Sequence, residues 1–251
     1  MAAVGSHVSA AAVHGLPWLR GWPDDVHLTV PKTQYRSGTK GLVLHTRPVQ
    51  PADVVAHGGL RFTSVARTVA DVALQGDVRT TVVLADAALR QGLVKRDVHR
   101  ALGGLPHHRG RALAARSIEF ADPRSGSPAE SLARVVFWEL GLPAPVLQQR
   151  FDVGGHRYEV DFWFPEQGVI VEIDGRAKYA QERYRNGRTA AQVIVDEKRR
   201  HERLNSVPAV RVIVRLEWRD LWDLDALSLR LRTAGLPSRA RPVRSARDLT
   251  T

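Results

Sequence analysis

Three carboxylates lie close together on two neighbouring extended segments in the second half of the chain. Asp161 falls near the end of the segment HRYEVDFWF, and Glu172 and Asp174 end the apolar run GVIVEID. Side chains two residues apart in a strand point to the same side, so Glu172 and Asp174 share one face. If the two strands pair, all three acids converge. Acids at the end of an apolar, central strand are unfavourable unless a cation or hydrogen-bond donors meet them.

The chemistry that such a set could perform is metal-assisted hydrolysis. Clustered carboxylates are the ligands that Mg²⁺ or Mn²⁺ prefers, and the chain has no cysteine, which excludes thiolate metal sites. A cation held by Asp161, Glu172 and Asp174 would polarise a phosphodiester and lower the pKa of a bound water. We expect Lys178 to orient that water or the phosphate, and Glu130 to act as an acid or outer ligand.

Each of these acids also has an ordinary structural interpretation. Glu130 is the last residue of the capping box Ser127-Pro128-Ala129-Glu130, where it would bond the backbone at the start of a helix. Asp161 could end a strand by accepting N–H groups, and Asp174-Gly175 is a common turn dipeptide. A protein without catalytic turnover therefore remains an alternative.

The charge of the chain indicates a nucleic-acid partner. The net charge is +11 with a pI near 10.8, and the segment 176–203 holds nine basic residues against four acids. Phosphate neutralisation drives binding by such surfaces without sequence readout, and we favour DNA. A biased codon supply, or a solvated helix face with ion pairs, would explain the same composition. The residues expected to contact nucleic acid are Arg176, Lys198, Arg199, Arg200 and Arg203.

Composition sets the general class. Hydrophobic residues make up 43% and charged residues 25%, which is typical of a folded globular protein. No run approaches the roughly 18 apolar residues of a membrane span, and no signal peptide is apparent, so we expect a cytoplasmic protein without a membrane partner. The histidines, among them His7, His27 and His45, show no recurring ligand spacing, and we expect them to be surface or hydrogen-bonded residues.

The segments that must position the acids have clear patterns. The capping box opens a helix with an apolar face, and a Gly154-Gly155 turn separates two extended segments. A basic helix then leads into a β-branched strand and a last helix. The expected strands and helices, in order, are strands Val146–Val153, His156–Phe164 and Gly168–Asp174, helix Gly187–Asn205, strand Val210–Leu216 and helix Trp218–Arg232.

The first half reads as strands followed by helices. Extended segments are expected at Val26–Val30 and Gly41–Thr46, after a short helix at Val8–His14, and helices follow from Ser64 to Phe120. The cluster ADPRSGS at 121–127 has the composition of a linker. We therefore expect an N-terminal domain over 1–122, a second domain over 127–232 and a basic, disordered tail over 233–251.

The second domain resembles a known endonuclease family. The elements that carry the resemblance are Ser127-Pro128-x-Glu130, RYEVDFWFP, VIVEIDGRAKY, the basic helix and VRVIVRLEWRDLW, and they look like very-short-patch-repair-like endonuclease domains. These in turn resemble PD-(D/E)XK nucleases, which implies a metal at Asp161 and Glu172. Asp174 stands where that pattern has its lysine, and Lys178 is the candidate substitute. The fold implied is α/β, a small N-terminal α+β domain followed by a restriction-endonuclease-like domain with a mixed central sheet flanked by helices.

The N-terminal segments are similar to another family. SHVSAAAVHGLPWL, VHLTVP, LRFTSVARTVADVAL and ADAALRQGLV resemble AbiEi-type antitoxins of type IV toxin-antitoxin systems. Those proteins usually begin with a DNA-reading winged helix, which we do not expect before Ser6, so promoter binding is not implied. The resemblance implies a second reading, in which the endonuclease-like domain is a catalytically inactive DNA- or protein-binding regulatory module with a cognate protein partner.

Overall fold

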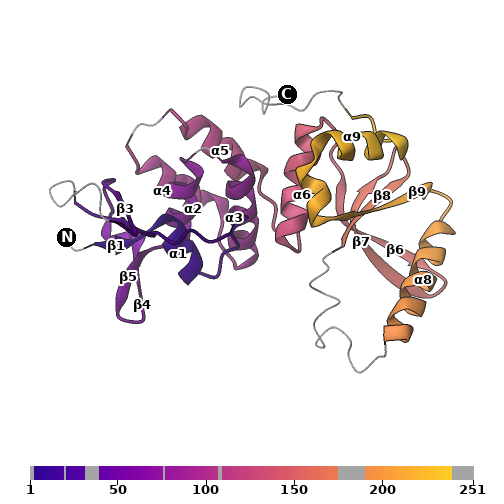
Figure 1. Ribbon diagram of the computed structural model, residues 1–251, viewed down its shortest axis with the longest axis horizontal. Helices are drawn as coiled ribbons and strands as arrows, with labels where there is room; N and C mark the ends of the chain where they lie inside the picture. The colour runs from indigo at the N-terminus through magenta and orange to yellow at the C-terminus, as the bar shows by residue number, and fades with distance from the viewer. Residues whose placement is uncertain are drawn as a thin grey trace. The chain divides into compact units, whose positions relative to one another are not determined.

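The chain folds into two compact units, and each has its own mixed sheet and helices (Figure 1). The computed structural model describes residues 3–19, 21–31, 40–75, 77–106, 109–174 and 190–238. The boundary between the units falls after Leu132, inside the helix Pro128–Glu139 and a few residues after the linker composition at 121–127. From Ala133 on, this helix belongs to the second unit. The expected α/β class is confirmed.

The first unit combines a five-stranded sheet with a group of helices. The sheet order is β3-β2-β1-β5-β4, with parallel pairing of β2 with β3 and of β1 with β5. Its strands are β1 (Val4–Gly5), β2 (Val26–Thr29), β3 (Leu42–His45), β4 (Val54–His57) and β5 (Leu60–Thr63), with a 3-10 turn, η2 (Pro51–Asp53), before β4. Its helices are α1 (His7–Val13), α2 (Val65–Ala73), α3 (Val78–Arg90), α4 (Lys95–Gly103) and α5 (Arg111–Phe120).

The sheet of this unit is larger than the sequence patterns indicate. The prediction contained the strands at Val26 and Gly41 but not β1, β4 or β5. The turn between β4 and β5 is Gly58-Gly59, and both glycines have positive φ, +57° and +77°. That conformation is the one that tight hairpin turns require, and glycine adopts it without steric penalty.

Helices α2 to α5 surround one apolar core with α1. Ser64 caps α2 as expected, since its hydroxyl accepts a hydrogen bond from Arg67 N at 3.3 Å. Asp77 caps α3 by accepting from two backbone N–H groups. The core residues lie at helical spacing and are fully buried; they include Val69, Val72, Leu84, Ala88 and Ile118.

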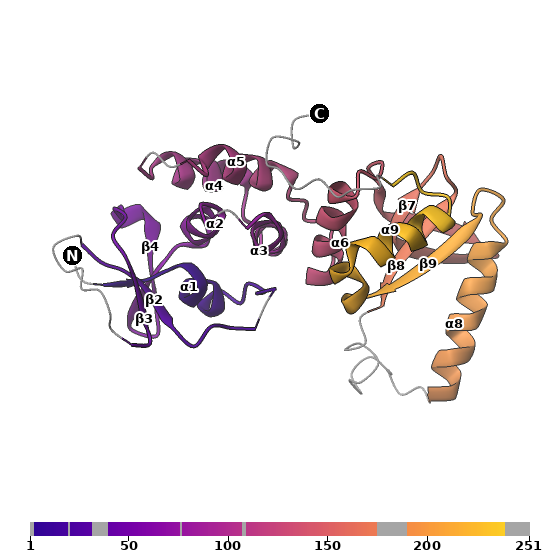
Figure 2. The same cartoon turned by 45° about the horizontal axis from the view of Figure 1, so that its top comes forward.

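The second unit has a four-stranded sheet in the order β6-β7-β8-β9. Strands β6, β7 and β8 pair antiparallel, and β9 pairs parallel to β8 through a connection that contains α8. Figures 1 and 2 show α6 and α9 on one side of this sheet and α8 on the other. The unit is built from α6 (Pro128–Glu139), β6 (Val146–Val153), β7 (His156–Phe164), β8 (Val169–Asp174), α8 (Ala190–Asn205), β9 (Val212–Glu217), η4 (Trp218–Trp222) and α9 (Leu224–Thr233).

Helix α6 begins at the predicted capping box. Ser127 Oγ accepts from Glu130 N at 3.2 Å, and the carboxylate of Glu130 accepts from Gly126 N at 2.7 Å and from the Ser127 hydroxyl at 2.8 Å. Further along the helix, Phe137 packs edge to face against Phe162 and Phe164 of β7. These contacts attach α6 to the sheet that carries the predicted acids.

The C-terminal end differs from the prediction in two ways. The stretch Trp218–Arg232 is not one helix, because Asp223 ends η4 and its carboxylate caps α9 by accepting from Ala226 N at 3.0 Å. The disordered tail was predicted to start at residue 233, but Leu236 is buried and its N–H bonds to Leu231 O at 3.0 Å. Residues 239–251 lie outside the described part of the chain.

Candidate functional site

Asp161 and Glu172 stand at neighbouring positions on β7 and β8. The register pairs Phe162 with Val171, so Asp161 and Glu172 are the next residues along the two antiparallel strands. The carboxylate of Asp161 reaches β8, where its Oδ2 accepts from Ile173 N at 2.8 Å. The N–H of Ile173 thus bonds to the side chain of Asp161 instead of to a backbone carbonyl of β7, at the point where the pairing of the two strands ends.

The backbone is irregular at this point. On the neighbouring strand, Gln148 has a φ of +52°, an unfavourable conformation for a residue with a side chain. The register of β6 and β7 places Gln148 opposite Asp161, since Leu147 pairs with Phe162 and Gln149 with Val160. Strained backbone of this kind often accompanies functional sites.

Alternation along β7 also changes at Asp161. Val160 belongs to the core cluster that includes Leu204 of α8, whereas Phe162 packs against Phe137 of α6. Trp163 then returns to the cluster on the α8 side. In a regular strand, Val160 and Trp163 would lie on opposite faces. The irregularity thus turns Asp161 toward the end of β8.

Glu172 is held by two arginines. It is 8% exposed, its Oε1 lies 2.5 Å from the guanidinium of Arg200, and its Oε2 lies 3.9 Å from that of Arg215. Arg215 in turn contacts Glu197 of α8 at 2.7 Å. Arg200 also donates to the backbone oxygen of Glu159 at 2.8 Å. A buried carboxylate on this strand is therefore neutralised by protein cations.

The charges around Arg200 keep it protonated. Burial disfavours the charged guanidinium and is the largest single effect. The hydrogen bond to Glu172 and the charges of Glu172, Glu197 and Asp161 together outweigh it, so the pKa of Arg200 is raised. Arg200 was predicted to contact nucleic acid, and its guanidinium here bonds within the protein.

Asp174 ends β8 two residues after Glu172 and lies on the same side of the sheet. It pairs in register with Glu217 of β9. The carboxylate of Glu217 caps η4 and lies 3.0 Å from the guanidinium of Arg219, so its contacts are to neighbouring residues in the sequence. Arg176 and Lys178, the predicted phosphate contact and the predicted substitute for the catalytic lysine, lie outside the described residues.

The carboxylate oxygens of Asp161, Glu172 and Asp174 are of the type that binds a hard divalent cation. In the structure, however, Glu172 contacts Arg200 and Arg215. Among the described residues, the oxygens of Asp161, Glu172 and Asp174 are not a set with all members within 4.8 Å of one another. A cation shared by these acids would have to displace Arg200 from Glu172. In the part of the chain that the structure describes, the carboxylates of Glu172 and Glu197 contact the guanidinium groups of Arg200 and Arg215.

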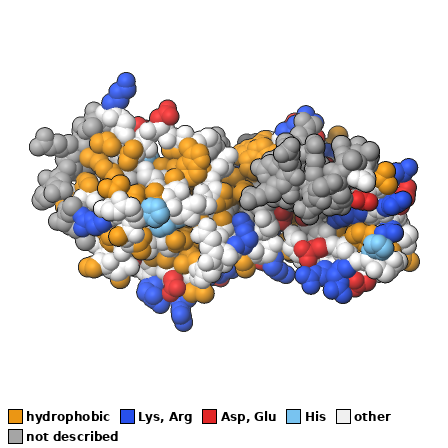
Figure 3. Space-filling model, turned by 90° about the horizontal axis from the view of Figure 1, so that it is seen from below, with side chains coloured by type: hydrophobic (Ala, Val, Ile, Leu, Met, Phe, Trp, Pro, Cys, Tyr) orange, Lys and Arg blue, Asp and Glu red, His pale blue; other side chains and the backbone are white. Residues whose placement is uncertain are grey.

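The basic residues predicted on α8 have different surroundings. Lys198 and Arg199 are exposed, and Lys198 has one loose partner, Glu202, at 3.9 Å. Arg203 is half-buried and donates to the hydroxyl of Tyr158 at 2.6 Å. Of the four described members of the predicted set, Lys198 and Arg199 present their charge to solvent. Figure 3 shows that Lys and Arg side chains also reach the surface elsewhere on both units.

Glu130 was predicted as a secondary acid. Both of its carboxylate oxygens are engaged at the start of α6, where they accept from Gly126 and Ser127. The residue is 5% exposed. This is the structural interpretation that the capping box allowed, and its predicted catalytic role gains no support from these contacts.

A second cluster of chemically competent side chains lies in the first unit. His7 begins α1, His27 lies on β2 and His45 ends β3, and one ring nitrogen from each lies within 4.8 Å of the others. The sequence shows no recurring ligand spacing among these histidines and predicts surface or hydrogen-bonded residues, yet His7 is buried. The parallel register of β2 and β3, which places Thr29 beside His45, brings them together.

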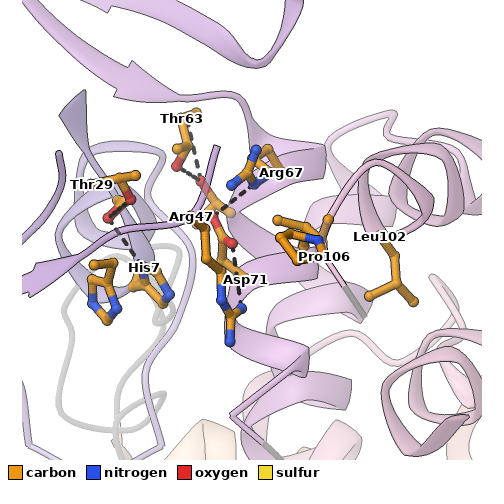
Figure 4. Close-up of polar contacts among 12 residues, drawn as sticks. His7, Thr29, Arg47, Thr63, Arg67, Asp71, Leu102 and Pro106 are labelled. Carbon is orange, nitrogen blue, oxygen red and sulfur yellow. Dashed lines mark hydrogen bonds and ion pairs between the residues drawn. The ribbon is translucent and has the colours of Figure 1, made fainter. Parts of the chain in front are cut away.

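Close to these histidines, α2 contributes a buried ionic network (Figure 4). Arg67 is 1% exposed and donates to Asp71 at 3.0 Å and to Asp53 at 3.0 Å. Arg47, two residues after His45, lies 3.8 Å from the other oxygen of Asp71. Burial raises the pKa of Asp71, and the charge of Arg67 opposes that effect.

Comparisons with known proteins place this two-unit α/β chain in a family. It is 31% identical over 189 residues to Uncharacterized protein MT2308 and Uncharacterized protein Rv2248, each from a strain of Mycobacterium tuberculosis. The match covers 70% of this chain and 69% of each relative. The chain belongs to the family of these proteins. No family model and no solved structure matches it. None of the described helices has the length and apolar character needed to cross a bilayer.

Proposed function

We propose that the second unit binds nucleic acid and hydrolyses a phosphodiester with Mg²⁺ or Mn²⁺ bound at Asp161, Glu172 and Asp174. The observation that carries the proposal is the register of β7 and β8, which sets Asp161 beside Glu172 where their pairing ends. Asp174 follows two residues later on the same side of β8. The second unit also has the helix, three antiparallel strands, helix and parallel strand in the order predicted from the segments that carry the endonuclease resemblance.

The residues of this chain would act in three ways. The carboxylates of Asp161, Glu172 and Asp174 would hold the cation, which when bound polarises the phosphate and acidifies a water. Arg200 lies at the same place with a raised pKa, so it remains cationic and could donate to a phosphate oxygen once Glu172 turns to the metal. The exposed side chains of α8 would contact the phosphate backbone beside the site.

A second function is favoured by one specific observation. Both oxygens of Glu172 face arginines, at 2.5 Å and 3.9 Å, and this arrangement satisfies the buried carboxylate without a metal. On this basis the unit would be a binding module that does not turn over. Lys198 and Arg199 would contact nucleic acid, or an acidic protein partner, through the exposed face of α8.

Cleavage assays separate the two proposals. Purified chain is incubated with supercoiled plasmid, single-stranded DNA and RNA over a range of Mg²⁺ and Mn²⁺ concentrations. Asp161→Asn and Glu172→Gln should abolish metal-dependent cutting, whereas the matched control Glu202→Gln, an exposed α8 acid, should leave it unchanged. Equal cutting by all four proteins would indicate a contaminating nuclease and defeat the catalytic proposal.

Binding is measured on the same proteins without metal. For a module that contacts the phosphate backbone, the logarithm of the binding constant falls linearly with the logarithm of the salt concentration. The slope is about −0.9 for each phosphate neutralised on duplex DNA. Lys198→Ala and Arg199→Ala should each reduce that slope by about one. Salt-dependent binding without cleavage at any metal concentration would support the inactive module.

A further inference from the structure

The cluster of His7, His27 and His45 is built as a ligand set, and it is separate from the acids of the second unit. The three rings come from α1, β2 and β3, and each offers a nitrogen within 4.8 Å of the other two. His45 Nε2 and His27 Nδ1 are 3.2 Å apart. This contact is a hydrogen bond between the two rings. Two nitrogens bound at 2.0–2.1 Å to one tetrahedral ion lie about 3.4 Å apart, so an ion could replace the shared proton with little change in spacing.

His7 is fixed in place by its neighbours. It is 1% exposed, its ring stacks on that of His45 with centroids 3.5 Å apart, and its Nδ1 lies 3.0 Å from Ser6 Oγ. The hydroxyl of Thr29 donates to the same Ser6 oxygen at 2.9 Å, as Figure 4 shows in part. When Nδ1 carries the proton and donates to Ser6 Oγ, Nε2 keeps its lone pair for an ion, and a bond of this kind from the second nitrogen orients metal-binding imidazoles.

The backbone at His7 is held in an unfavourable conformation. Its φ is +51°, and within the described chain it shares positive φ among non-glycine residues only with Gln148. Such a conformation costs on the order of 1–3 kcal/mol and persists where the surroundings enforce it. Here Ser6 N donates to His27 O at 2.9 Å, and this bond ties the start of α1 to β2. The strain places the His7 ring over His45, and the two stacked rings would have to tilt apart for a lone pair of each to point at one ion.

The electrostatics of the cluster suit neutral imidazoles. Burial, followed by the charges of His45 and Arg47, lowers the pKa of His7 to about 2. Burial, followed by the charge of His27, lowers the pKa of His45 to about 4. Burial also lowers the pKa of His27, and the charge of Asp25 opposes it. Neutral rings keep the lone pairs that metals bind.

The cations near the cluster have partners of their own. Arg67 bonds to Asp71 and Asp53, and Arg47 faces Asp71 at 3.8 Å. Two carboxylates thus offset part of the charge of the two guanidinium groups. The charge of Arg47 still lowers the pKa of His7 and His45, so an ion bound there must overcome some repulsion from Arg47. His27 and His45 are half-buried, so an ion can reach them from solvent.

We propose that His7, His27 and His45 bind a borderline divalent transition metal, with Zn²⁺ as the ion of choice. Imidazole suits Zn²⁺, whereas Mg²⁺ prefers oxygen, so this site and the carboxylates of the second unit select different metals. Three protein ligands leave the fourth tetrahedral position for water or a ligand oxygen, as in open zinc sites.

Metal titration of the full chain tests the proposal. EDTA-treated protein is titrated with Zn²⁺ against a chromophoric chelator, and we expect one equivalent to bind. His27→Gln and His45→Gln should each lose more than the about 10–100-fold in affinity that changes to outer-shell residues cause, and Ser6→Ala should lose about 10-fold. His57→Gln, an exposed histidine of β4, and Asp161→Asn should bind as the unaltered chain does. Equal Zn²⁺ uptake by the chain and both cluster variants would overturn the site.

A measurement on the unaltered chain covers the case in which the variants fail to fold. X-ray absorption of the Zn²⁺ complex should show imidazole nitrogens at about 2.0–2.1 Å, with multiple scattering that fits three rings. A first shell of carboxylate oxygens would assign the ion to other residues and refute the proposal. Because neither measurement involves nucleic acid, cleavage by the second unit can fail without affecting this result.

Discussion

Replacing Glu172 by Gln tests whether the ionic network in the second unit is structural. Glutamine keeps the shape of the side chain and removes its charge. In the unaltered chain, Glu172 accepts Arg200 at 2.5 Å and faces Arg215 at 3.9 Å. After the change, Glu197 is the remaining carboxylate that contacts Arg215 directly, at 2.7 Å. We expect the free energy of unfolding of this unit to fall.

The size of the loss follows from burial. Exposed ion pairs contribute about 0.2–1 kcal/mol, and breaking a fully buried pair costs about 3–5 kcal/mol. The side chain of Glu172 is 11% exposed, that of Arg200 24% and that of Arg215 31%, between these limits. We therefore expect a loss of about 2 kcal/mol. In a unit of this size the melting temperature should fall by about 6–10 °C.

Thermal and urea unfolding of matched variants provide the measurement. Glu202→Gln is the control, because Glu202 is a carboxylate of α8 with a 3.9 Å contact to Lys198 and a side chain that is 62% exposed. The control should lose less than about 0.5 kcal/mol. A double-mutant cycle of Glu172→Gln with Arg200→Met isolates the pairwise term, which should exceed about 1 kcal/mol.

Two results would contradict this reasoning. If Glu172→Gln were as stable as the control variant, the arginines would not stabilise Glu172. If it were more stable than the unaltered chain, the acids would repel one another more strongly than the arginines attract them. The second result would also strengthen the metal proposal, because a cation would then be needed to offset the carboxylates.

Further predictions concern stability and are checked by denaturant unfolding with circular dichroism. Arg67→Ala should cost about 3–5 kcal/mol, because it leaves the buried Asp71 without its principal partner; a loss under 1 kcal/mol would show that Arg47 compensates. Phe137→Ala removes a fully buried ring that contacts two phenylalanines of β7 and should cost about 3–5 kcal/mol. Gly168→Ala should cost about 2 kcal/mol or more, since φ is +68° and a Cβ would lie 2.7 Å from the Ala209 oxygen.

Much of the second unit could be predicted because its signals are local. The capping box at Ser127, the Gly154-Gly155 turn and the apolar run before Glu172 each specify structure over a few residues. The strands β6, β7 and β8 follow these predictions within a residue at either end. The break at Asp223 was missed, although aspartate is a common helix cap, because the apolar spacing continues on both sides of it.

The first unit was predicted less completely because its sheet depends on long-range pairing. Strand β1 has two residues and joins β2 to β5, and no periodic pattern can be recognised over so short a segment. The Gly58-Gly59 turn was the available signal for β4 and β5, since it lies between VVAH and LRFT. The cluster of His7, His27 and His45 depends on that same sheet, so it could not be seen without it.

Side-chain partners were the hardest feature to predict. The basic composition of α8 suggested one surface that binds phosphate. In the structure, the basic side chains of α8 point in two different directions. Arg200 and Arg203 bond within the unit, whereas Lys198 and Arg199 face solvent. Residues three or four apart share a side of a helix, so Arg200 and Arg203 face the sheet together. The spacing allowed this division once the side of α8 that faces the sheet was known.

Each candidate site contains or adjoins one of the two non-glycine residues with positive φ in the described part of the chain. His7 is itself a member of the histidine cluster, and Gln148 lies opposite Asp161 on β6. Neither position is a turn that glycine would normally fill, and each has a side chain that makes the conformation unfavourable. Strain at two separate places is easiest to understand if each place gains something from the side chain that the strain positions. Glycine at either position should then relieve the backbone and stabilise the fold, while it weakens Zn²⁺ binding at His7 or alters cleavage near Gln148.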